Sequence, residues 1–335
     1  MGETQGVGLR LVFMGTPAFA AAILEHALRW EGGRVVGVYA QPDRPCGRGL
    51  ERRPPDTKVL ALGHGLPVLQ PLNFKTPEAR AELAALRPDL LLVAAYGLIL
   101  PQAVLDIPRL GAVNVHASLL PKYRGAAPIQ RALMAGETVT GVSIMQMDAG
   151  LDTGDVLLAR ELPIGPEDTA ASLHDSLADL GGRALLEALD LIAAGRSQRA
   201  PQDPAQATYA PKLRKDEGGI DWSRPAAEIH DRVRGVHPWP GAYFFWDSPG
   251  RKKPLRLGLA PGRPGGPRPL DAAPGTILGE EDGMLAIACA DRTYLTPAVT
   301  PEGRKRIGAA AFVCGYLCDA PSPSAGPDCP PQPGT

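Results

Sequence analysis

The sequence predicts an α/β protein with two domains, a doubly wound, mostly parallel sheet followed by a smaller β-barrel. Three observations support this fold class. The chain has 335 residues, more than one core usually holds, because domains run about 100 to 200 residues. The first half alternates short β-branched runs with helical stretches, as parallel sheets with crossover helices do. The second half carries short apolar runs separated by turns, which is typical of a barrel.

The first domain is predicted over residues 1–196, with strands and helices following one another along the chain. Residues 10–14 form the first strand. The turn at 15–17 leads into a helix at 18–30, since proline fits the first helical turn. Further strands are expected at residues 34–40, 67–69, 89–95, 111–118, 139–146 and 155–162. Helices are expected at residues 129–135 and 169–194, the latter with leucines near helical spacing.

A linker is predicted at residues 197–211, where the sequence is polar, contains proline and shows no periodicity. The second domain is predicted over residues 212–318 and begins with a helix at 226–236. Its strands are expected at residues 242–246, 255–259, 275–278, 285–288 and 294–299. Five strands indicate a small barrel. Residues 319–335 contain six prolines and are expected to be disordered.

The composition excludes a membrane protein and predicts a cytoplasmic location. The longest apolar stretch, residues 90–100, ends at Pro101, whereas a spanning helix needs about 20 residues. Gly15-Thr16-Pro17 interrupts the apolar start that would otherwise resemble an export signal. The five cysteines form no paired framework, which indicates a reducing compartment. Cys314 and Cys318 are the only close pair, and no second Cys or His pair has zinc-finger spacing, so both are expected to be ordinary thiols and no metal is expected.

The net charge of −1 conceals a difference between the two domains. Residues 1–196 carry a formal charge of −3, and residues 213–318 carry +3. A mildly basic second domain is compatible with binding a phosphate backbone. Solvated surface charge explains the same values equally well.

Polar side chains occupy one face of the strand predicted at residues 111–118. Asn114 and His116 alternate with Val113 and Val115, so the strand period puts the two polar residues on one face. The next segment leaves the carboxyl end of this strand, where open α/β sheets place ligands. The residues alone allow two interpretations, a hydrogen-bonded pair in the core or part of a site.

A glycine-containing loop at residues 147–155 carries three carboxylates, Asp148, Asp152 and Asp155. Their spacing does not fit an EF-hand calcium loop. One interpretation is an Asx-type turn with the carboxylates in solvent. In the other, a carboxylate reaches His116, orients the imidazole and favours its charged form.

An amide, an imidazole and a carboxylate together suit transfer between an amine and an acyl carbon. Asn114 and a protonated His116 can stabilise the oxyanion that develops on a tetrahedral carbon. The sequence has no serine nucleophile elbow and no HExxH metal motif. These residues therefore predict a direct transfer without a metal.

With these residues the chain closely resembles the methionyl-tRNA formyltransferase family of folate-dependent formyltransferases. The resemblance is carried by Asn-Val-His-Ala-Ser-Leu-Leu-Pro at 114–121 and Arg-Gly-Ala-Ala-Pro-Ile-Gln at 124–130. Further matching segments are residues 13–17, 41–49, 95–101 and 145–155, with weaker matches at 209–212, 220–222, 237–240 and 274–306. The resemblance spans about residues 9–317. It implies a Rossmann-like sheet domain followed by an OB-like barrel.

The resemblance also implies a reaction. The donor would be 10-formyltetrahydrofolate, and the acceptor would be the α-amino group of methionine on initiator tRNA. Asn114, His116 and Asp152 take the family's catalytic positions. Asn114 would stabilise the oxyanion, His116 would do so and transfer a proton, and Asp152 would hold His116 charged or in place. The folate-binding positions are Ser118, Leu119, Leu120 and Pro121, with main-chain groups of Leu98, Ile99 and Leu100 lining the pteridine pocket.

Contacts with tRNA are implied by the same resemblance. Basic residues of an insertion at 43–58 would neutralise acceptor-stem phosphates, and the alternative is a solvated surface loop. They are Arg44, Arg48, Arg52, Arg53 and Lys58. Candidates in the second domain, chosen by charge clustering, are Lys212, Arg214, Lys215, Arg251, Lys252, Lys253, Arg304, Lys305 and Arg306. Trp222, Trp239 and Trp246 are interpreted as core residues and not as base-stacking platforms. A monomer is expected.

Three other functions stay open. A folate-dependent formyltransferase acting on a small or nucleotide-linked amine would use the same residues. A nicotinamide-dependent oxidoreductase would share the doubly wound sheet, but the first strand ends in Gly15-Thr-Pro-Ala-Phe19 and lacks the G-x-G-x-x-G glycines. A catalytically inactive RNA-binding protein would tolerate the loss of Asn114 and His116.

Overall fold

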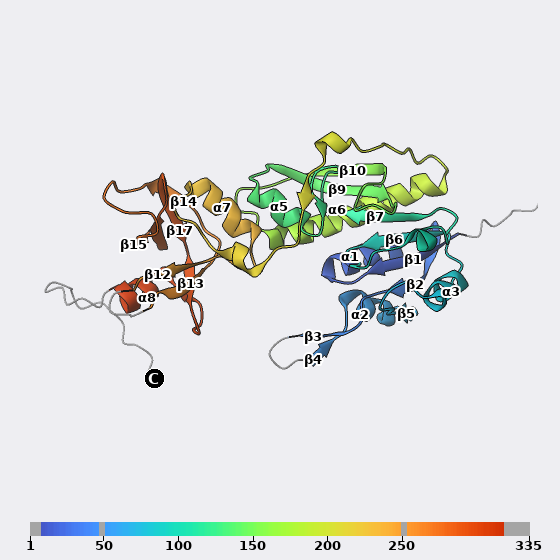
Figure 1. The fold of residues 1–335 in the computed structure, drawn as a ribbon, viewed down its shortest axis with the longest axis horizontal. Helices are drawn as coiled ribbons and strands as arrows, with labels where there is room; N and C mark the ends of the chain where they lie inside the picture. Colours follow the sequence, from blue (N-terminus) through green and yellow to red (C-terminus); the bar gives the residue numbers. More distant parts are fainter. Residues whose placement is uncertain (1–7, 47–50, 249–252, 318–335) are drawn as a thin grey trace, which may run out of the picture. The chain divides into compact units, whose positions relative to one another are not determined.

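The computed structural model describes residues 8–46, 51–248 and 253–317, and the chain divides into two compact units (Figure 1). Of these described residues, unit 1 comprises those within 8–129, 138–164 and 172–212, and unit 2 comprises those within 130–137, 165–171 and 213–317. Residues 197–211, interpreted as a linker, group with unit 1. The predicted tail at 319–335 lies outside the described residues. The domain boundaries drawn from the sequence stay a prediction.

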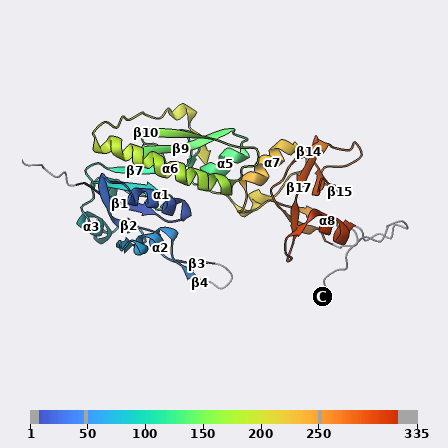
Figure 2. The ribbon, with the colours of Figure 1, turned by 180° about the vertical axis from the view of Figure 1, so that it is seen from behind.

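Unit 1 is built on a seven-stranded sheet with the strand order β10-β9-β7-β6-β1-β2-β5 (Figures 1 and 2). The strands are β1 (Leu9–Gly15), β2 (Gly33–Tyr39), β5 (Val68–Leu69), β6 (Leu90–Ala94), β7 (Ala112–His116), β9 (Val139–Gln146) and β10 (Val156–Pro163). The first five run parallel, and β9 pairs antiparallel with both β7 and β10. The predicted doubly wound, mostly parallel sheet is therefore confirmed. Its strand order reverses between β1 and β6, where sheets of this kind open a crevice for ligands.

Helices in unit 1 begin at recognisable start signals. Helix α1 (Ala18–Leu28) follows Pro17, whose fixed φ suits a helix start. Helix α3 (Pro77–Ala85) is capped by Thr76, whose hydroxyl accepts the N–H of Ala79. The remaining helices that lie wholly or partly in unit 1 are α2 (Asp56–Gly63), α4 (Gln102–Leu105), α5 (Pro128–Met134) and α6 (Ala170–Ala193).

The packing of α6 decides which face of β7 is left for chemistry. A methyl group at Gly181 of α6 would come within 2.9 Å of Val115 Cγ1, so Val115 faces this helix. Asn114 and His116 therefore lie on the opposite face of β7, because side chains alternate along a strand. A glycine at 181 lets the helix approach the strand closely.

Unit 2 contains two antiparallel sheets, β12-β13-β18-β19 and β14-β17-β16-β15. Their strands are β12 (Tyr243–Trp246), β13 (Leu255–Leu259), β14 (Arg263–Pro267), β15 (Ile277–Glu281), β16 (Met284–Ala288), β17 (Arg292–Thr296), β18 (Ala298–Pro301) and β19 (Ile307–Gly308). Helices α7 (Ala226–Gly235) and α8 (Ala309–Phe312) also lie in unit 2, together with most of α5. The all-antiparallel arrangement is compatible with the predicted barrel, whose closure stays a prediction.

The expectation of five strands in this unit is wrong. Residues 294–299 belong to two strands, β17 and β18, separated at Pro297, because proline cannot donate to the ladder. Strand β14 has the sequence Arg-Pro-Gly-Gly-Pro, which lacks the β-branched and aromatic residues that mark strands. Its extended conformation is held by pairing with β17, so the residues of β14 alone do not predict a strand.

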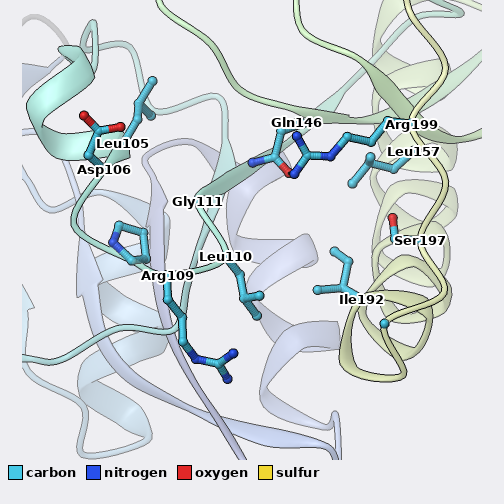
Figure 3. A pocket seen from close by; sticks show the side chains of 12 residues that line it. Leu105, Asp106, Arg109, Leu110, Gly111, Gln146, Leu157, Ile192, Ser197 and Arg199 are labelled. Carbon is cyan, nitrogen blue, oxygen red and sulfur yellow. The ribbon is translucent and has the colours of Figure 1, made fainter.

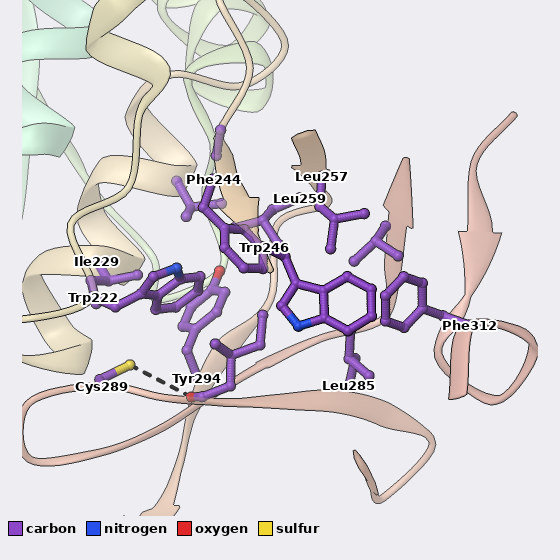
Figure 4. Close-up of a cluster of buried hydrophobic side chains, with 14 of the residues drawn as sticks. Trp222, Ile229, Phe244, Trp246, Leu257, Leu259, Leu285, Cys289, Tyr294 and Phe312 are labelled. Atoms are coloured by element: carbon purple, nitrogen blue, oxygen red, sulfur yellow. Dashed lines mark hydrogen bonds between the residues drawn. The ribbon is translucent and has the colours of Figure 1, made fainter. Parts of the chain in front are cut away.

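Buried aromatic side chains fill the core of unit 2 (Figure 4). Trp222 and Trp246 are 7% and 9% exposed, which confirms the core interpretation for both. The Trp222 ring packs edge-on against Phe244, with 5.1 Å between ring centroids. Trp239 is 49% exposed, so the core interpretation is wrong there. It lies in the turn after α7, which carries it away from the cluster.

Within the described part of the chain, no helix combines the length and apolar character that crossing a membrane requires. Cys289 is buried and free, and Cys314 is disulfide-bonded. The expectation of unpaired cysteines is therefore wrong at Cys314.

Candidate active site

The site forms where β7 ends. Asn114 pairs through its backbone with Val93 of β6 and Met145 of β9, which places it in the middle of the sheet. His116 is the last residue of β7 and is 5% exposed. Both side chains project from one face of the strand, as the strand pattern predicts, and the packing of α6 shows that it is the face this helix does not cover.

His116 faces a hydrogen-bond acceptor on each side of its ring. Nε2 lies 3.0 Å from the carbonyl oxygen of Tyr123, and since a carbonyl only accepts, this nitrogen carries a proton and donates. Nδ1 lies 3.7 Å from Oδ2 of Asp152, which is beyond hydrogen-bond length. Nδ1 is therefore the ring nitrogen positioned to meet a reacting group.

Asp152 is turned inward by the loop that carries it. Its φ of +52° is unusual for a residue other than glycine, and its Oδ2 accepts the backbone N–H of Gly125 at 2.8 Å. Asp148, in contrast, accepts from Gly150 N at 2.9 Å and Thr153 Oγ1 at 2.7 Å. The Asx-turn interpretation is thus confirmed for Asp148, whereas Asp152 faces the histidine.

The segment expected to hold folate is fixed to the sheet by two serines. Ser118 is 1% exposed and donates to the carbonyl of Lys122 at 2.6 Å. Ser143 of β9 donates to the carbonyl of Ser118 at 2.8 Å and accepts the N–H of Leu120 at 3.0 Å. Leu119, Leu120 and Pro121 are half-buried. The segment therefore presents apolar surface on a rigid backbone directly after His116.

The three residues predicted to line a pteridine pocket differ in exposure. Leu100 is 5% exposed and belongs to the core, Leu98 is half-buried, and Ile99 is 90% exposed. They follow Gly97, whose φ is +80°, at the carboxyl end of β6. A role through main-chain groups fits this arrangement better than one through three buried side chains.

The basic insertion forms a short hairpin of β3 (Arg44–Cys46) and β4 (Glu51–Arg53). Arg52 and Arg53 are exposed. Arg44 donates to Gln41 Oε1 at 2.9 Å. Lys58 lies 2.9 Å from both carboxylate oxygens of Asp43 and 2.8 Å from Gln70 Oε1. Arg48 lies outside the described residues.

The basic residues differ in how available they are to bind an anion, because some already have hydrogen-bond or ionic partners. Hydrogen bonds from Gln70 and then from Lys58 lower the pKa of the Asp43 carboxyl, so Lys58 is engaged with a carboxylate. Arg214 lies 3.3 Å from Asp216. The other described candidates are exposed, namely Lys212, Lys215, Lys253, Arg304, Lys305 and Arg306. Arg251 and Lys252 lie outside the described residues.

Sequence reasoning missed three residues that complete the site. Gly125 supplies the N–H that binds Asp152. Gln202, in the segment interpreted as a linker, donates to the carbonyls of Asp152 and Gly154 and accepts from Arg124, which is 4% exposed. Arg124 and Gly125 belong to the Arg-Gly-Ala-Ala-Pro-Ile-Gln motif at 124–130, one of the segments that carry the family resemblance. Nothing in a polar segment without periodicity marks Gln202.

A cavity of about 510 Å³ lies at the amino end of β7, beside Gly111 (Figure 3). Arg199 reaches Gln146 Oε1 at 3.5 Å on its wall. None of the predicted catalytic or folate-binding residues lines it, so this cavity does not mark the site at His116. Within the described residues, no group of three His, Cys, Asp or Glu side chains is arranged to hold a metal ion.

Comparisons with known proteins match both units. Residues 9–189 match the formyl transferase family, and residues 212–317 match the formyl transferase C-terminal domain. A methionyl-tRNA formyltransferase of Nitratidesulfovibrio vulgaris is 55% identical over 320 residues, which cover 94% of this chain and 96% of the relative. One of Geobacter sulfurreducens is 47% identical over 309 residues, covering 92% of this chain and 94% of the relative.

A solved structure shares the fold. HypX from Aquifex aeolicus in complex with tetrahydrofolic acid is similar with a TM-score of 0.60 at 18% identity, over 93% of this chain. The chain spans about half the length of HypX, 48% of it. At this identity the likeness concerns the fold alone.

Proposed function

The chain belongs to the methionyl-tRNA formyltransferase family of formyl transferases, and from this premise we propose that it transfers a formyl group from 10-formyltetrahydrofolate to the α-amino group of methionyl-initiator tRNA. This reaction serves translation initiation. The observation that carries the proposal is the similarity to methionyl-tRNA formyltransferases over nearly the whole chain, both units included. Tetrahydrofolic acid in a protein of the same fold supports a folate-derived donor.

The geometry at the end of β7 supports roles for three side chains. The donor supplies a formyl carbon bonded to a folate nitrogen, and the acceptor amine forms its new bond to that carbon. The Asn114 amide donates to the formyl oxygen as negative charge develops there. His116 Nδ1, which has no hydrogen bond to Asp152 at 3.7 Å, donates to the same oxygen or passes a proton to the departing nitrogen.

Asp152 would hold His116 charged or in place, while the backbone N–H of Gly125 holds the carboxylate of Asp152. The amine loses a proton as the folate nitrogen gains one, so the transfer balances without an acyl-enzyme. Ser118, Leu119, Leu120 and Pro121 would hold the donor on their rigid backbone, with main-chain groups of Leu98, Ile99 and Leu100 facing its pteridine.

Basic side chains at two places would hold the tRNA. Arg52 and Arg53 are exposed on β4 and are suited to neutralise acceptor-stem phosphates. In unit 2, Arg304, Lys305 and Arg306 are exposed together between β18 and β19. Lys58 is a weaker candidate, because it is bound to Asp43 and Gln70.

The test is formyl transfer to charged initiator tRNA by the purified chain, with and without the folate donor. We expect donor-dependent transfer. His116→Ala should lower kcat about 10²- to 10⁴-fold and leave tRNA affinity unchanged, while His64→Ala, at an exposed histidine, should retain wild-type turnover.

The alternative is a folate-dependent formyltransferase for a small or nucleotide-linked amine. A panel of acceptors decides between the two, because the catalytic residues would be the same. A higher kcat/KM for a small amine than for charged initiator tRNA would overturn the proposed acceptor.

A further inference from the structure

Gln202 joins two segments that meet at the candidate site. Its Nε2 donates to the carbonyl oxygen of Asp152 at 2.9 Å and to that of Gly154 at 2.6 Å. Its Oε1 accepts from Arg124, at 3.1 Å from Nε and 2.7 Å from Nη2. The half-buried side-chain amide of Gln202 thus connects the loop at residues 147–155, called the acidic loop below, to strand β8 (Arg124–Gly125).

The partners require a glutamine amide and fix its orientation. A guanidinium only donates and a carbonyl only accepts, so the oxygen must face Arg124 and the nitrogen must face the loop. A glutamate could still accept from Arg124 but could not donate to the two carbonyls. The site therefore needs a side chain with one acceptor and two donors at its tip.

The segment that carries Gln202 is anchored on both sides of it. Ala200 exchanges two backbone hydrogen bonds with Val156 of β10, each 2.9 Å long. Strand β11 (Tyr209–Ala210) pairs in parallel with β8. Gln202 is therefore held on a fixed backbone, although its sequence reads as a linker.

Each end of this connection lies at a segment that contacts His116 or contains Asp152. On one side, Gln202 binds the backbone of Asp152, whose carboxylate faces the imidazole. On the other, Arg124 lies between Tyr123, whose carbonyl binds His116, and Gly125, whose N–H binds Asp152. A shift of either segment changes the distance between the carboxylate and the ring.

We propose that Gln202 is a positioning residue for formyl transfer, which sets the place of the Asp152 carboxylate against His116 by clamping the loop to Arg124. This inference rests on the proposed function, because it assigns Gln202 an effect on turnover through Asp152. Arg124 is the second half of the clamp.

The test uses Gln202→Ala and Gln202→Glu in the full chain, with Gln206→Ala as the matched control. Gln206 is an exposed glutamine of the same segment that binds only Asp203 among the described residues. We expect both Gln202 variants to lower kcat about 10- to 100-fold, with KM for tRNA and folate within about twofold of wild type. Gln206→Ala should match wild type. A wild-type kcat in Gln202→Glu would overturn the donor role.

A double-mutant cycle separates positioning from general destabilisation. If Gln202 acts through Asp152, the double variant Asp152→Asn/Gln202→Ala should have a kcat less than about twofold below that of Asp152→Asn alone. The effects of two residues that act through one another are not additive. The full effect of Gln202→Ala in the Asp152→Asn background would refute action through Asp152.

Amide hydrogen exchange tests the clamp without any assay of transfer. Residues 148–155 should exchange faster in Gln202→Ala than in wild type, and unchanged exchange there would refute the clamp. If wild type transfers no formyl group, the proposed function fails, and the exchange result still decides whether Gln202 holds the loop.

Discussion

Asp152 Oδ2 lies 3.7 Å from His116 Nδ1, although the two residues belong to separate segments of the chain. His116 ends a central strand, whereas Asp152 sits in the loop between β9 and β10. The same carboxylate oxygen accepts the N–H of Gly125, so a third segment determines where it points. An imidazole with a carboxylate beside it and an amide two residues away is an arrangement suited to acyl transfer to an amine.

Replacing Asp152 with Asn should remove the charge opposite His116 while retaining an oxygen that accepts from Gly125. We expect kcat to fall about 10²- to 10⁴-fold with little change in thermal stability, measured by steady-state formylation and thermal unfolding. Asp148→Asn is the control, because that side chain only closes its own turn, and it should keep turnover near wild type. Normal turnover in Asp152→Asn would remove this carboxylate from the mechanism.

Gly125→Ala should damage the site through the backbone. Gly125 has a φ of +115°, and a Cβ there would meet the carbonyl oxygen of Ala210 at 2.9 Å. The substitution should shift β8, lower kcat and lower the melting temperature. Gly195→Ala is the matched control, since φ is +64° there but no atom lies within 4 Å of the added Cβ. Equal effects of the two variants would indicate that φ alone matters and that the contact with Ala210 does not.

The double variant Arg52→Ala/Arg53→Ala should weaken tRNA binding and reduce its dependence on salt. Both side chains are exposed on β4, and removing one arginine–phosphate ion pair lowers the slope of log K against log salt by about 0.7 to 0.9. Filter binding across a salt series measures this slope. Lys75→Ala/Arg196→Ala removes two exposed charges elsewhere on unit 1 and should leave the slope unchanged. A wild-type slope in the first variant would detach this hairpin from the tRNA.

Glu217→Gln should destabilise the folded chain at neutral pH and much less in acid. Hydrogen bonds from Arg131 are the main reason why the pKa of Glu217 is lowered, and the backbone N–H of Arg214 adds to it. A carboxyl whose folded pKa is lowered contributes stability above its ordinary value and loses it as pH falls through the folded value.

We therefore expect the free energy of unfolding of Glu217→Gln to be about 1 kcal/mol below wild type at pH 7, with the difference shrinking below about pH 4. Urea unfolding at both pH values measures it. Glu228→Gln provides the control, because Glu228 is exposed and 3.8 Å from Arg224, and exposed pairs contribute little. A pH-independent difference for Glu217→Gln would show that the ionised carboxylate is not the cause.

The hydrophobic pattern of the sequence predicted most strands of unit 1, because the central strands are buried along most of their length. Strands such as β6 are buried at every residue, and a continuous apolar run of that length has few alternatives. Sequence patterns did not predict the structure where local residue preferences conflict with tertiary packing. Strand β14 contains only Arg, Pro and Gly and exists through its neighbour, and Trp239 is apolar in character but lies in an exposed turn.

The sequence by itself determined the fold class, the family and that Asn114 and His116 share one face of β7, because these follow from periodicity and from residues close together in the chain. Only the tertiary structure decided which carboxylate of the acidic loop reaches the histidine, and that Gly125, Arg124 and Gln202 hold it there. Asp148 and Asp152 have the same side chain in the same loop. Their different roles arise from hydrogen bonds to segments distant in sequence, and such partners are chosen by the packing of the whole unit.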